Sequence, residues 1–503
     1  MDNWVVVLQV VAAIIFAYVR YRLSVAERKR IAMNVPSVTG GVPFFGQVFK
    51  MLKGSPWDIM NKWAQEFGHR FTFHLFGSDA FVVSDPDILK VILQTKVHIF
   101  RKDLEWVYRP FLVILGNGLV TAHGESWRRQ RTLLSSALRI DILDDIPAMA
   151  VRAVQRLCVK LDKCCADGTT IEMAEEFRHL TLQVIAEAIL SLSPEESDET
   201  FAHMYLPIVE EGNLRTWHPE RMYLPTPAYF KHQADVKKLN DYVVGLITKR
   251  WDLRREEKAS RKKTTRRQDI LDKVLNAISE DDWNAATIAQ VRDEVKTFIL
   301  AGHETSASML AWTLYELSMN PKLLATLREE TEQVYGAPVA PGADLSTCMP
   351  KKRESLSRLE YADCCLRESL RKYSVVPSVV RVPSEDVEIN DHVIPKGTSV
   401  IINIMAAHHN EENWKNPSEY NPTRFLKGES SIKPYTFLPF VDGPRNCLGQ
   451  FLSLLESKVV LSMLVHHYDF EVTNLNDAGL THPFMVPIIP KTGHIMKVSR
   501  RNG

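Results

Sequence analysis

The spacing of hydrophobic and polar positions changes several times along the chain, and each change predicts a different element. From Trp4 to Val19 the sequence WVVVLQVVAAIIFAYV is apolar on every face of a helix. From about Pro86 to Tyr335, apolar residues recur at i, i+3 and i+4 in stretches such as DILKVILQTK, which predicts helices. From Arg381 to Ile402, short β-branched runs separated by Asn-Asp and Pro-Lys-Gly turns predict a small sheet. We therefore predict a mainly α fold with a smaller β region, in the α+β class.

The apolar segment at the N-terminus predicts a membrane anchor. Its sixteen residues would span about 24 Å as a helix, somewhat less than the roughly 30 Å hydrocarbon core of a bilayer. Trp4 at one end, with Tyr18 and Tyr21 at the other, suits the two interfaces, and the basic cluster that follows favours a cytoplasmic position for that side. We therefore expect an uncleaved, single-pass anchor over residues 1–22, with the rest of the chain on the cytosolic face.

Two alternatives to an anchor are weaker. A cleavable signal peptide normally carries a basic residue before its apolar run, and none precedes this one. A buried core helix is less consistent with a terminal run that is apolar on all faces.

The segment after the anchor predicts a hinge over residues 23–50. Basic residues are followed there by Pro36, Gly40, Gly41, Pro43 and Gly46, which interrupt helices and strands alike. The stretch HRFTFHLFGSDAFVVSD then alternates around a Gly-Ser-Asp turn, which predicts a β-hairpin. Because no internal repeat or later linker divides the remainder, residues 51–503 are expected to form one large body.

Composition and charge exclude several classes of protein. The chain is 45% apolar and 24% charged with a net charge of +1, which is typical of a globular protein and gives no sign of nucleic-acid binding. Its seven cysteines include two adjacent pairs and form neither a disulfide framework nor a C-x-x-C metal clip, which favours a reducing compartment. The basic run from Lys249 to Arg267 is more simply a solvated loop than a contact with acidic lipid or an acidic partner.

The longest predicted helix covers residues 287–321 and carries AGHETS at its centre. Gly302 has no side chain, which would let a flat ligand approach the backbone. The Thr305 hydroxyl can bond to the carbonyl of Ala301 and loosen the helix. Burial of Glu304 would push its carboxyl toward protonation, so that it could relay protons. A long core helix with one tolerated glycine and one self-bonded threonine explains the segment equally well.

Two further patterns place polar groups on one helix face. Glu368 and Arg371, in CLRESLRKY, are spaced i, i+3 and can form an ion pair. Trp127 and Arg131, in SWRRQRTLL, share a face at i, i+4 and offer a donor pair for a carboxylate or phosphate, although an aromatic ring stacked on a surface arginine is the commoner explanation. E-x-x-R spacing is expected to give only solvated helix pairs at Glu27/Arg30, Glu125/Arg128 and Glu175/Arg178.

The stretch PFVDGPRNCLGQ places Cys447 just before a run with helical periodicity. A cysteine at a helix N-terminus meets unpaired N–H groups and the positive end of the helix dipole, which favour the thiolate, and a bound metal would deprotonate it outright. Gly443 supplies a turn, Gly449 lets a planar group lie close to the helix start, and Arg445 can meet an anionic substituent. A reactive free thiol is the alternative, but it requires neither Phe440 nor Gly449.

Together these motifs resemble the cytochrome P450 family. F-x-x-G-x-R-x-C-x-G over residues 440–449, A-G-x-E-T over 301–305, E-x-x-R over 368–371 and W-x-x-x-R over 127–131 occur in the family's order along the chain. The cysteine motif is specific, and the anchor and hinge fit the microsomal type. The resemblance implies a P450 fold, with residues 51–503 as the haem-thiolate catalytic domain.

The resemblance also implies a role for each motif residue. Cys447 would be the proximal thiolate ligand of a haem b iron, with Phe440 near the sulfur. Thr305 and Glu304 would deliver protons during oxygen activation. Glu368 and Arg371 would form a structural lock with Arg424 in NPTRF. The cofactor-binding residues would be Trp127, Arg131, Ala301, Gly302, Arg381, Phe440, Gly443, Arg445 and Gly449, among which Trp127 and the three arginines would meet the haem propionates.

Two positions depart from the family pattern. Thr423 stands where the P-E-R element usually has Glu, so the third arm of the lock rests on Arg424 alone. Asp442 stands where a glycine is common and adds a negative charge near the cysteine loop. Neither departure removes a catalytic group.

The implied activity is that of a monooxygenase at the endoplasmic reticulum membrane. NADPH electrons would arrive through NADPH-cytochrome P450 reductase, with cytochrome b5 as an additional donor. The alternatives are a reductase-independent isomerase or dehydratase that acts on a hydroperoxide, and a non-catalytic haem-binding sensor.

The substrate pocket would draw, by family position, on residues 100–119, 217–229, 298–301, 375–379 and 483–486. Most of these residues are apolar, which favours an isoprenoid, fatty-acyl or sterol-like substrate. Arg215, His218 and Arg221 could bind a carboxylate, or they could equally be solvated on a mobile lid.

Overall fold

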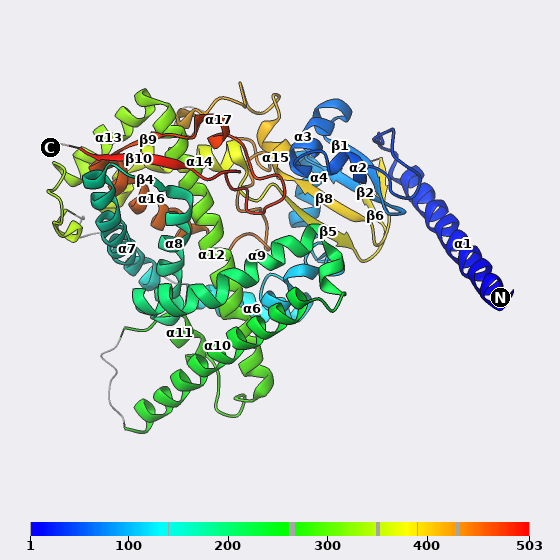
Figure 1. The fold of residues 1–503 in the computed structure, drawn as a ribbon, viewed down its shortest axis with the longest axis horizontal. Coiled ribbons are helices and arrows are strands. Elements are labelled where there is room, and N and C mark those ends of the chain that lie inside the picture. Colours follow the sequence, from blue (N-terminus) through cyan, green and yellow to red (C-terminus); the bar gives the residue numbers. More distant parts are fainter. Residues whose placement is uncertain are drawn as a thin grey trace. The chain divides into compact units, whose positions relative to one another are not determined.

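The computed structural model describes residues 2–138, 140–260, 267–348, 353–389, 391–428 and 432–501, and Figure 1 shows their arrangement. Part of the predicted basic run, residues 261–266, and Asn390 of the predicted Asn-Asp turn lie outside the described residues. The predicted mainly α fold with small sheets is confirmed.

The described elements follow in chain order. The α-helices are α1 (Asp2–Met33), α2 (Val48–Met51), α3 (Pro56–Phe67), α4 (Pro86–Lys90), α5 (Leu112–Leu115), α6 (Gly124–Ala137), α7 (Ile140–Asp167), α8 (Met173–Leu190), α9 (His203–Trp217), α10 (Pro227–Ala259), α11 (Ile270–Asn276), α12 (Ala285–Met319), α13 (Pro321–Tyr335), α14 (Glu360–Tyr373), α15 (Ile404–His409), α16 (Gln450–His467) and α17 (Leu475–Ala478). The strands are β1 (Arg70–Leu75), β2 (Ser78–Val83), β3 (Phe100–Lys102), β4 (Thr170–Glu172), β5 (Ser378–Pro383), β6 (Val387–Ile389), β7 (His392–Ile394), β8 (Ser399–Asn403), β9 (Tyr468–Val472) and β10 (Ile495–Arg500). Short 3-10 or π-helical segments are η1 (Val91–Thr95), η2 (Arg109–Phe111), η3 (Glu196–Ala202), η4 (Pro219–Met222), η5 (Leu345–Thr347), η6 (Arg353–Arg358) and η7 (Pro422–Phe425).

The chain folds into two compact units, each built from separate segments. Unit 1 comprises residues 1–103, 376–419 and 432–446, and unit 2 comprises residues 104–375, 420–431 and 447–503. The expected boundaries at residues 22 and 50, and the expected catalytic domain over 51–503, stay predictions.

Unit 1 is organised around a five-stranded sheet with the order β1-β2-β8-β5-β3. Strands β2 and β8 are parallel and the other neighbours are antiparallel. Phe81 and Val83 of β2 pack with Val400 and Ile402 of β8 in the main apolar core of this unit. The predicted hairpin is formed by β1 and β2, but Ser78 and Asp79 belong to the strand rather than to the turn.

The hairpin turn lies one residue earlier than predicted, at Phe76 and Gly77. Both residues have positive φ, 46° and 73°, which matches the twist that a two-residue hairpin turn requires.

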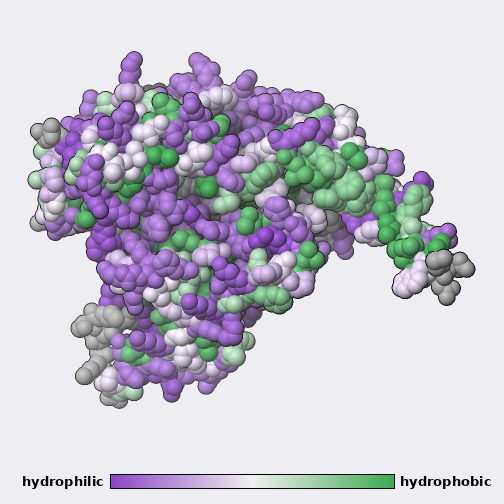
Figure 2. All heavy atoms as spheres, viewed as in Figure 1, coloured by the Kyte–Doolittle hydropathy of each residue, from purple (hydrophilic) through white to green (hydrophobic). Residues whose placement is uncertain are grey.

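Helix α1 contains the predicted anchor and continues beyond it. Among the described residues, one helix is long and apolar enough to cross a membrane by length and composition, and this candidate span covers Trp4–Met33. The apolar side chains from Trp4 to Phe16 are exposed, whereas Ala26 and Met33 are buried, and Figure 2 shows hydrophobic residues along this helix. The basic last turn packs on the sheet of unit 1, where Arg30 donates to the buried carboxylate of Asp79 at 3.1 Å. Arg30 therefore pairs with Asp79, and not with Glu27 as its spacing predicts.

Unit 2 is organised around helix α12, which packs against α8, α10, α14 and α16. The side chain of Asn284 accepts the N–H groups of Ala286 and Thr287, and this cap starts the helix two residues before the predicted position. The helix ends at Met319, and α13 begins at Pro321, as expected for a proline at the first helical position. A second sheet, with the order β4-β10-β9, lies in this unit.

Candidate functional site

The centre of α12 is open although most of this helix is buried. Ala301 is exposed and Gly302 and Thr305 are half-buried, whereas His303, Glu304 and the stretch from Ser306 to Leu314 are buried. The Thr305 hydroxyl donates to the carbonyl of Ala301 at 2.8 Å, which is the bond that the sequence predicts. The Thr305 hydroxyl therefore lies on an open face of α12, in the middle of an otherwise buried stretch.

The presence of glycine at position 302 is explained by helix packing, which the sequence does not reveal. A Cβ at this position would come within 2.8 Å of the Ile185 side chain on α8. The glycine is therefore required at least by the close approach of α8 to α12, whatever it contributes to ligand access.

The pKa of Glu304 contradicts the expectation that burial would push its carboxyl toward protonation. Burial does act to raise its pKa, but the interactions with His303 and Arg178 outweigh burial and lower the pKa to about 2. The Nη2 of Arg178 donates to the Glu304 carboxylate at 2.8 Å, and the Nε2 of His303 lies 3.1 Å from the same oxygen. Glu304 is therefore an ionised, paired carboxylate in this structure.

Arg178 connects Glu304 to the surface of unit 2. Its Nη1 donates to Glu175 at 2.8 Å, and His179 lies 3.5 Å from the other oxygen of that carboxylate. The hydrogen bond with His179 is the largest influence on the Glu175 carboxyl and, with Arg178, holds its pKa at about 2. The sequence predicts only a solvated pair at Glu175/Arg178, and this prediction is wrong because Arg178 also binds the buried Glu304.

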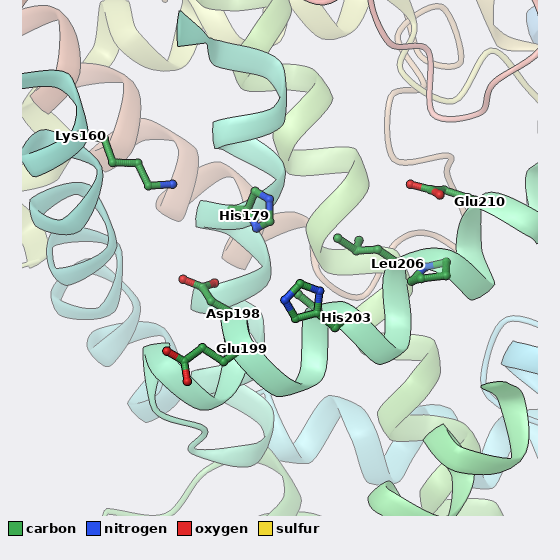
Figure 3. A pocket seen from close by; sticks show the side chains of 9 residues that line it. Lys160, His179, Asp198, Glu199, His203, Leu206 and Glu210 are labelled. Carbon is green, nitrogen blue, oxygen red and sulfur yellow. The ribbon is translucent and has the colours of Figure 1, made fainter. Parts of the chain in front are cut away.

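His179 faces a cavity of about 400 Å³ on the outer side of this network. Figure 3 shows His179 on α8 opposite Asp198, Glu199 and His203, which come from η3 and the start of α9. The four groups Glu304, Arg178, Glu175 and His179 thus form a continuous polar connection from the centre of α12 to this cavity.

Cys447 lies just before the N-terminus of α16, as predicted. The backbone N–H groups of Gly449 and Gln450 interact with its sulfur, and Arg131 acts on it electrostatically. Although Cys447 is exposed, desolvation by the surrounding protein raises the pKa of its thiol, so the expected preference for the thiolate does not arise from the protein alone. A Cβ on Gly449 would meet only this sulfur, at 4.0 Å, so the space beside the helix start is open.

Three helices of unit 2 bring the predicted motifs together. Arg131, on α6, is half-buried; burial lowers the pKa of its guanidinium, while the negative form of Cys447 would raise it. Trp127 is half-buried one turn earlier on the same helix. The hydroxyls of Ser306 and Ser453 lie 2.8 Å apart and join α12 to α16 one residue after Thr305. Within this unit, the W-x-x-x-R and A-G-x-E-T motifs are therefore linked to Cys447 and the helix that follows it.

The E-x-x-R motif on α14 forms a fully buried ion pair. Arg371 donates through Nε and Nη2 to the two oxygens of Glu368, at 2.8 Å each. Arg424 donates to the same carboxylate at 3.3 Å, and the backbone N–H of Asn421 does so at 2.9 Å. Thr423 caps the turn by bonding to Asn421 instead of extending this network.

Unit 1 holds a cluster of cations around β5. Lys102 and Arg381 lie directly opposite each other in the β3–β5 pair. Burial is the largest influence that holds the pKa of Lys102 well below its usual value. The positive charges of Arg381 and Arg445 lower it further. Like charges placed across a strand pair repel each other, and a bound anion would relieve that repulsion. Lys102 is not singled out by the sequence, because only the strand register places it beside Arg381.

The loop that precedes Cys447 is tightly constrained within unit 1. Gly443 has φ = 75°, and a side chain there would collide with the carbonyl of Leu93. Asp442 accepts the N–H of Gly443 at 2.6 Å, so this departure from the family pattern stabilises the local turn. Phe440 is half-buried in the same loop.

The residues of the two units, each taken by itself, fit a haem group. Unit 2 presents a cysteine at a helix start beside an arginine, and an open helix face with Ala301 and Thr305 on it. Unit 1 presents clustered cations that are suited to carboxylate groups. No group of three or more His, Cys, Asp or Glu side chains suited to a metal ion occurs in the part of the chain that the structure describes.

Comparisons with known proteins assign the chain to a family. The family profile described as Cytochrome P450 matches residues 36–496. Similar proteins include Cytochrome P450 4c21 of Blattella germanica, 29% identical over 466 residues (89% of this chain and 90% of that protein), and a Cytokinin hydroxylase of Arabidopsis thaliana, 30% identical over 441 residues (86% and 81%). Cytochrome P450 4X1 of Homo sapiens is 28% identical over 468 residues (90% and 88%). These matches define the class as haem-thiolate oxidoreductases. The chain belongs to the cytochrome P450 family of monooxygenases.

Proposed function

We propose that this protein is a membrane-anchored monooxygenase that hydroxylates an apolar, lipid-like substrate with dioxygen and with NADPH electrons from a reductase. One observation carries the proposal. Thr305 presents a hydroxyl on the open face of α12, and the Ser306–Ser453 contact ties that face to the helix that begins after Cys447. An isomerase that rearranges a hydroperoxide has no need of this hydroxyl.

Cys447 is the residue proposed to hold the haem iron. Its position at the start of α16 gives the sulfur two N–H donors, which would moderate the charge of a coordinated thiolate. When bound, haem supplies the iron chemistry that activates dioxygen. Trp127 and Arg131 of unit 2 are proposed to bind its carboxylates. For Arg381, Phe440, Gly443 and Arg445 of unit 1 the proposed contact with haem rests on the family motifs.

Thr305 and Glu304 are proposed to manage protons. The Thr305 hydroxyl can hold a proton close to the open face once it turns from the carbonyl of Ala301. The Glu304 carboxylate can carry a proton only after its contacts with His303 and Arg178 loosen, because these two partners hold it ionised. The connection through Glu175 to His179 gives this movement a route from the surface.

The substrate is proposed to be isoprenoid, fatty-acyl or sterol-like, because the segments assigned by family position to the pocket are mostly apolar. The Arabidopsis relatives are named as hydroxylases of cytokinin, which supports hydroxylation as the reaction type. The haem group is proposed to be haem b, and the electron donors are proposed to be NADPH-cytochrome P450 reductase and cytochrome b5.

The proposed location is the endoplasmic reticulum membrane, with the chain beyond the anchor on the cytosolic face. The exposed apolar helix α1 supports an anchor. The rings of Phe45, Phe49 and Phe76 are clustered and exposed in the same unit, and such a patch suits a lipid surface.

The reaction class can be tested in two measurements. The reduced protein with carbon monoxide should give the red-shifted Soret band of a thiolate-bound haem, and its absence would contradict both the monooxygenase and the isomerase. Product formation should require NADPH and reductase, and equal turnover without them would favour the isomerase.

Thr305→Ala supplies a residue-level test. It should uncouple oxygen consumption from product by roughly tenfold or more, since it removes one positioned proton donor. Thr305→Ser keeps the hydroxyl and is the matched control. Equal coupling in the wild type and both variants would contradict the assigned role.

A further inference from the structure

A cluster of charged side chains occupies the end of α9 and the short η4 helix of unit 2. The carboxylate of Glu211 accepts from Nε of Arg215 at 3.0 Å, and it accepts from Nε and Nη2 of Arg221 at 3.1 and 2.6 Å. One carboxylate therefore serves two guanidinium groups, and Glu220 also acts electrostatically on the outer one, Arg221.

Arg215 is sealed inside the fold, unlike Arg221. The Arg215 side chain is 3% exposed and that of Arg221 is 33% exposed. The Nη2 of Arg215 is buried and has no hydrogen-bond partner among the described residues. Because arginine stays protonated in proteins, this nitrogen is a charged donor that lacks an acceptor.

His232 on α10 lies beside this cluster and also carries buried nitrogens that have no hydrogen-bond partner among the described residues. It is 3% exposed, and neither ring nitrogen has a hydrogen-bond partner in the described part of the chain. Burial and then the charge of Arg215 lower the pKa of His232 to about 4, against the weaker opposing influence of Glu211 and Asp235. The ring is therefore neutral near pH 7 and offers one N–H donor and one acceptor nitrogen.

The cluster borders segments assigned above to the substrate pocket. On α9, a Cβ at Gly212 would lie 3.1 Å from the ring of Phe111. Two residues after Arg215, the Nε1 of Trp217 donates to the carbonyl of Phe484 at 2.7 Å. Phe111 and Phe484 both belong to the assigned segments, so an anion held by Arg215 lies next to the proposed binding region.

We propose that Arg215 and His232 form an anion subsite that binds the carboxylate of an apolar acid, and that this acid is the class of substrate that the enzyme oxidises. The assignment of this acid as the substrate rests on the proposed monooxygenase function, whereas the anion subsite itself does not. One carboxylate oxygen accepts from the Nη2 of Arg215 and the other accepts the N–H of His232. Glu211 is then the group that holds Arg215 in place, and Arg221 balances the charge of Glu211 at the surface.

Binding can be measured without turnover, by isothermal titration calorimetry on the purified holoenzyme at pH 7.5. The probes are two acid and ester pairs of different shape: dodecanoic acid with methyl dodecanoate, and abietic acid with methyl abietate. At least one acid should bind about tenfold more tightly than its ester, as expected for one charge-assisted contact in a buried site.

The variants distinguish the contribution of the buried Arg215 to acid binding from that of the exposed Arg221. Arg215→Met should abolish the preference for the acid, and His232→Phe should reduce it. Arg221→Met removes the same charge from the same carboxylate at the surface, and it should keep the preference. Glu211→Gln removes the competing carboxylate and should strengthen acid binding, which an unstable variant would not do. If Arg215→Met does not fold, the opposite effects of Glu211→Gln and His232→Phe decide the result.

Three results of the acid and ester titrations would overturn the subsite. They are equal binding of each acid and its ester, a preference that survives in Arg215→Met, and an equal loss in Arg221→Met. Arg215-dependent binding to vesicles of anionic phospholipid, without a preference for acids, would assign the cluster to a lipid headgroup and would also overturn it. Tight, Arg215-dependent acid binding with no oxidation would leave the subsite standing and contradict the proposed function.

Discussion

The pairing of Arg178 with Glu304 gives the sharpest test of the electrostatics at the centre of α12. The perturbation is Arg178→Met, which keeps much of the length of the side chain and removes its charge. It leaves the carboxylate of Glu304 buried, 5% exposed, with His303 as its nearest remaining partner.

The expected loss of stability follows from the pKa of Glu304. The pKa lies at about 2 in the folded protein against a reference of 4.5, and this depression corresponds to about 3 kcal/mol of stability. Because the folded pKa is depressed, this contribution is complete above pH 4.5 and is lost as the pH falls through 2. At pH 7, Arg178→Met should therefore lower the free energy of unfolding by about 1–2 kcal/mol, since the larger part of the contribution remains with His303.

The assay is urea unfolding in detergent at pH 7, followed by tryptophan fluorescence. Arg128→Met is the matched control, because its partner Glu125 lies 3.8 Å away and both side chains are about 70% exposed; we expect a change within about 0.5 kcal/mol. The double variant Arg178→Met with Glu304→Gln should recover most of the loss, since no buried charge remains. A loss below about 1 kcal/mol in the single variant, or purely additive losses in the double variant, would refute the reasoning.

Two further predictions concern residues near the site. Burial raises the pKa of Glu294 on α12 to about 7 from 4.5, so the unfolded state releases this proton first and stability should fall by about 2 kcal/mol between pH 5 and pH 7.5. Glu294→Gln should remove this fall and exposed Glu329→Gln should keep it in urea unfolding at the two pH values; equal profiles for all three proteins would contradict the assignment. Gly443→Ala should lower stability by about 1–3 kcal/mol because the residue has positive φ and abuts the carbonyl of Leu93, whereas Gly245→Ala, in an open helical position of α10, should not lower it. An unchanged thermal midpoint for Gly443→Ala would contradict this reading of the loop.

The features that sequence predicts well are those in which one short segment determines its own geometry. The bond from Thr305 to the carbonyl of Ala301 spans one helical turn, so the residue types and their spacing are sufficient to predict it. The ion pair of Glu368 and Arg371 is of the same kind. The roles assigned to these residues come from the family motifs. The Thr305 variants above test the role assigned to Thr305.

The features that sequence predicts poorly depend on partners from distant segments. Arg178 has the same E-x-x-R spacing as Arg128, and only the packing of α8 on α12 brings it to Glu304. The expected protonation of Glu304 is wrong for this reason. The local sequence suggests that Glu304 is buried, but it does not show that Arg178 of α8 lies beside the carboxylate. The role of Gly302 against Ile185 and the position of Lys102 opposite Arg381 likewise depend on contacts between elements.

The parallel pairing of β2 with β8 has a consequence for how this protein is made. Ala80 of β2 lies opposite Ser399 of β8, so the β1–β2 hairpin leaves the ribosome long before its partner strand exists. With roughly 300 residues still to be translated at about 5–20 residues per second, the apolar edge of the hairpin waits on the order of 15–60 s. During this interval it is a template for incorrect pairing with other nascent chains. The yield of intact protein should therefore depend on translation speed and on chaperones that cover this edge.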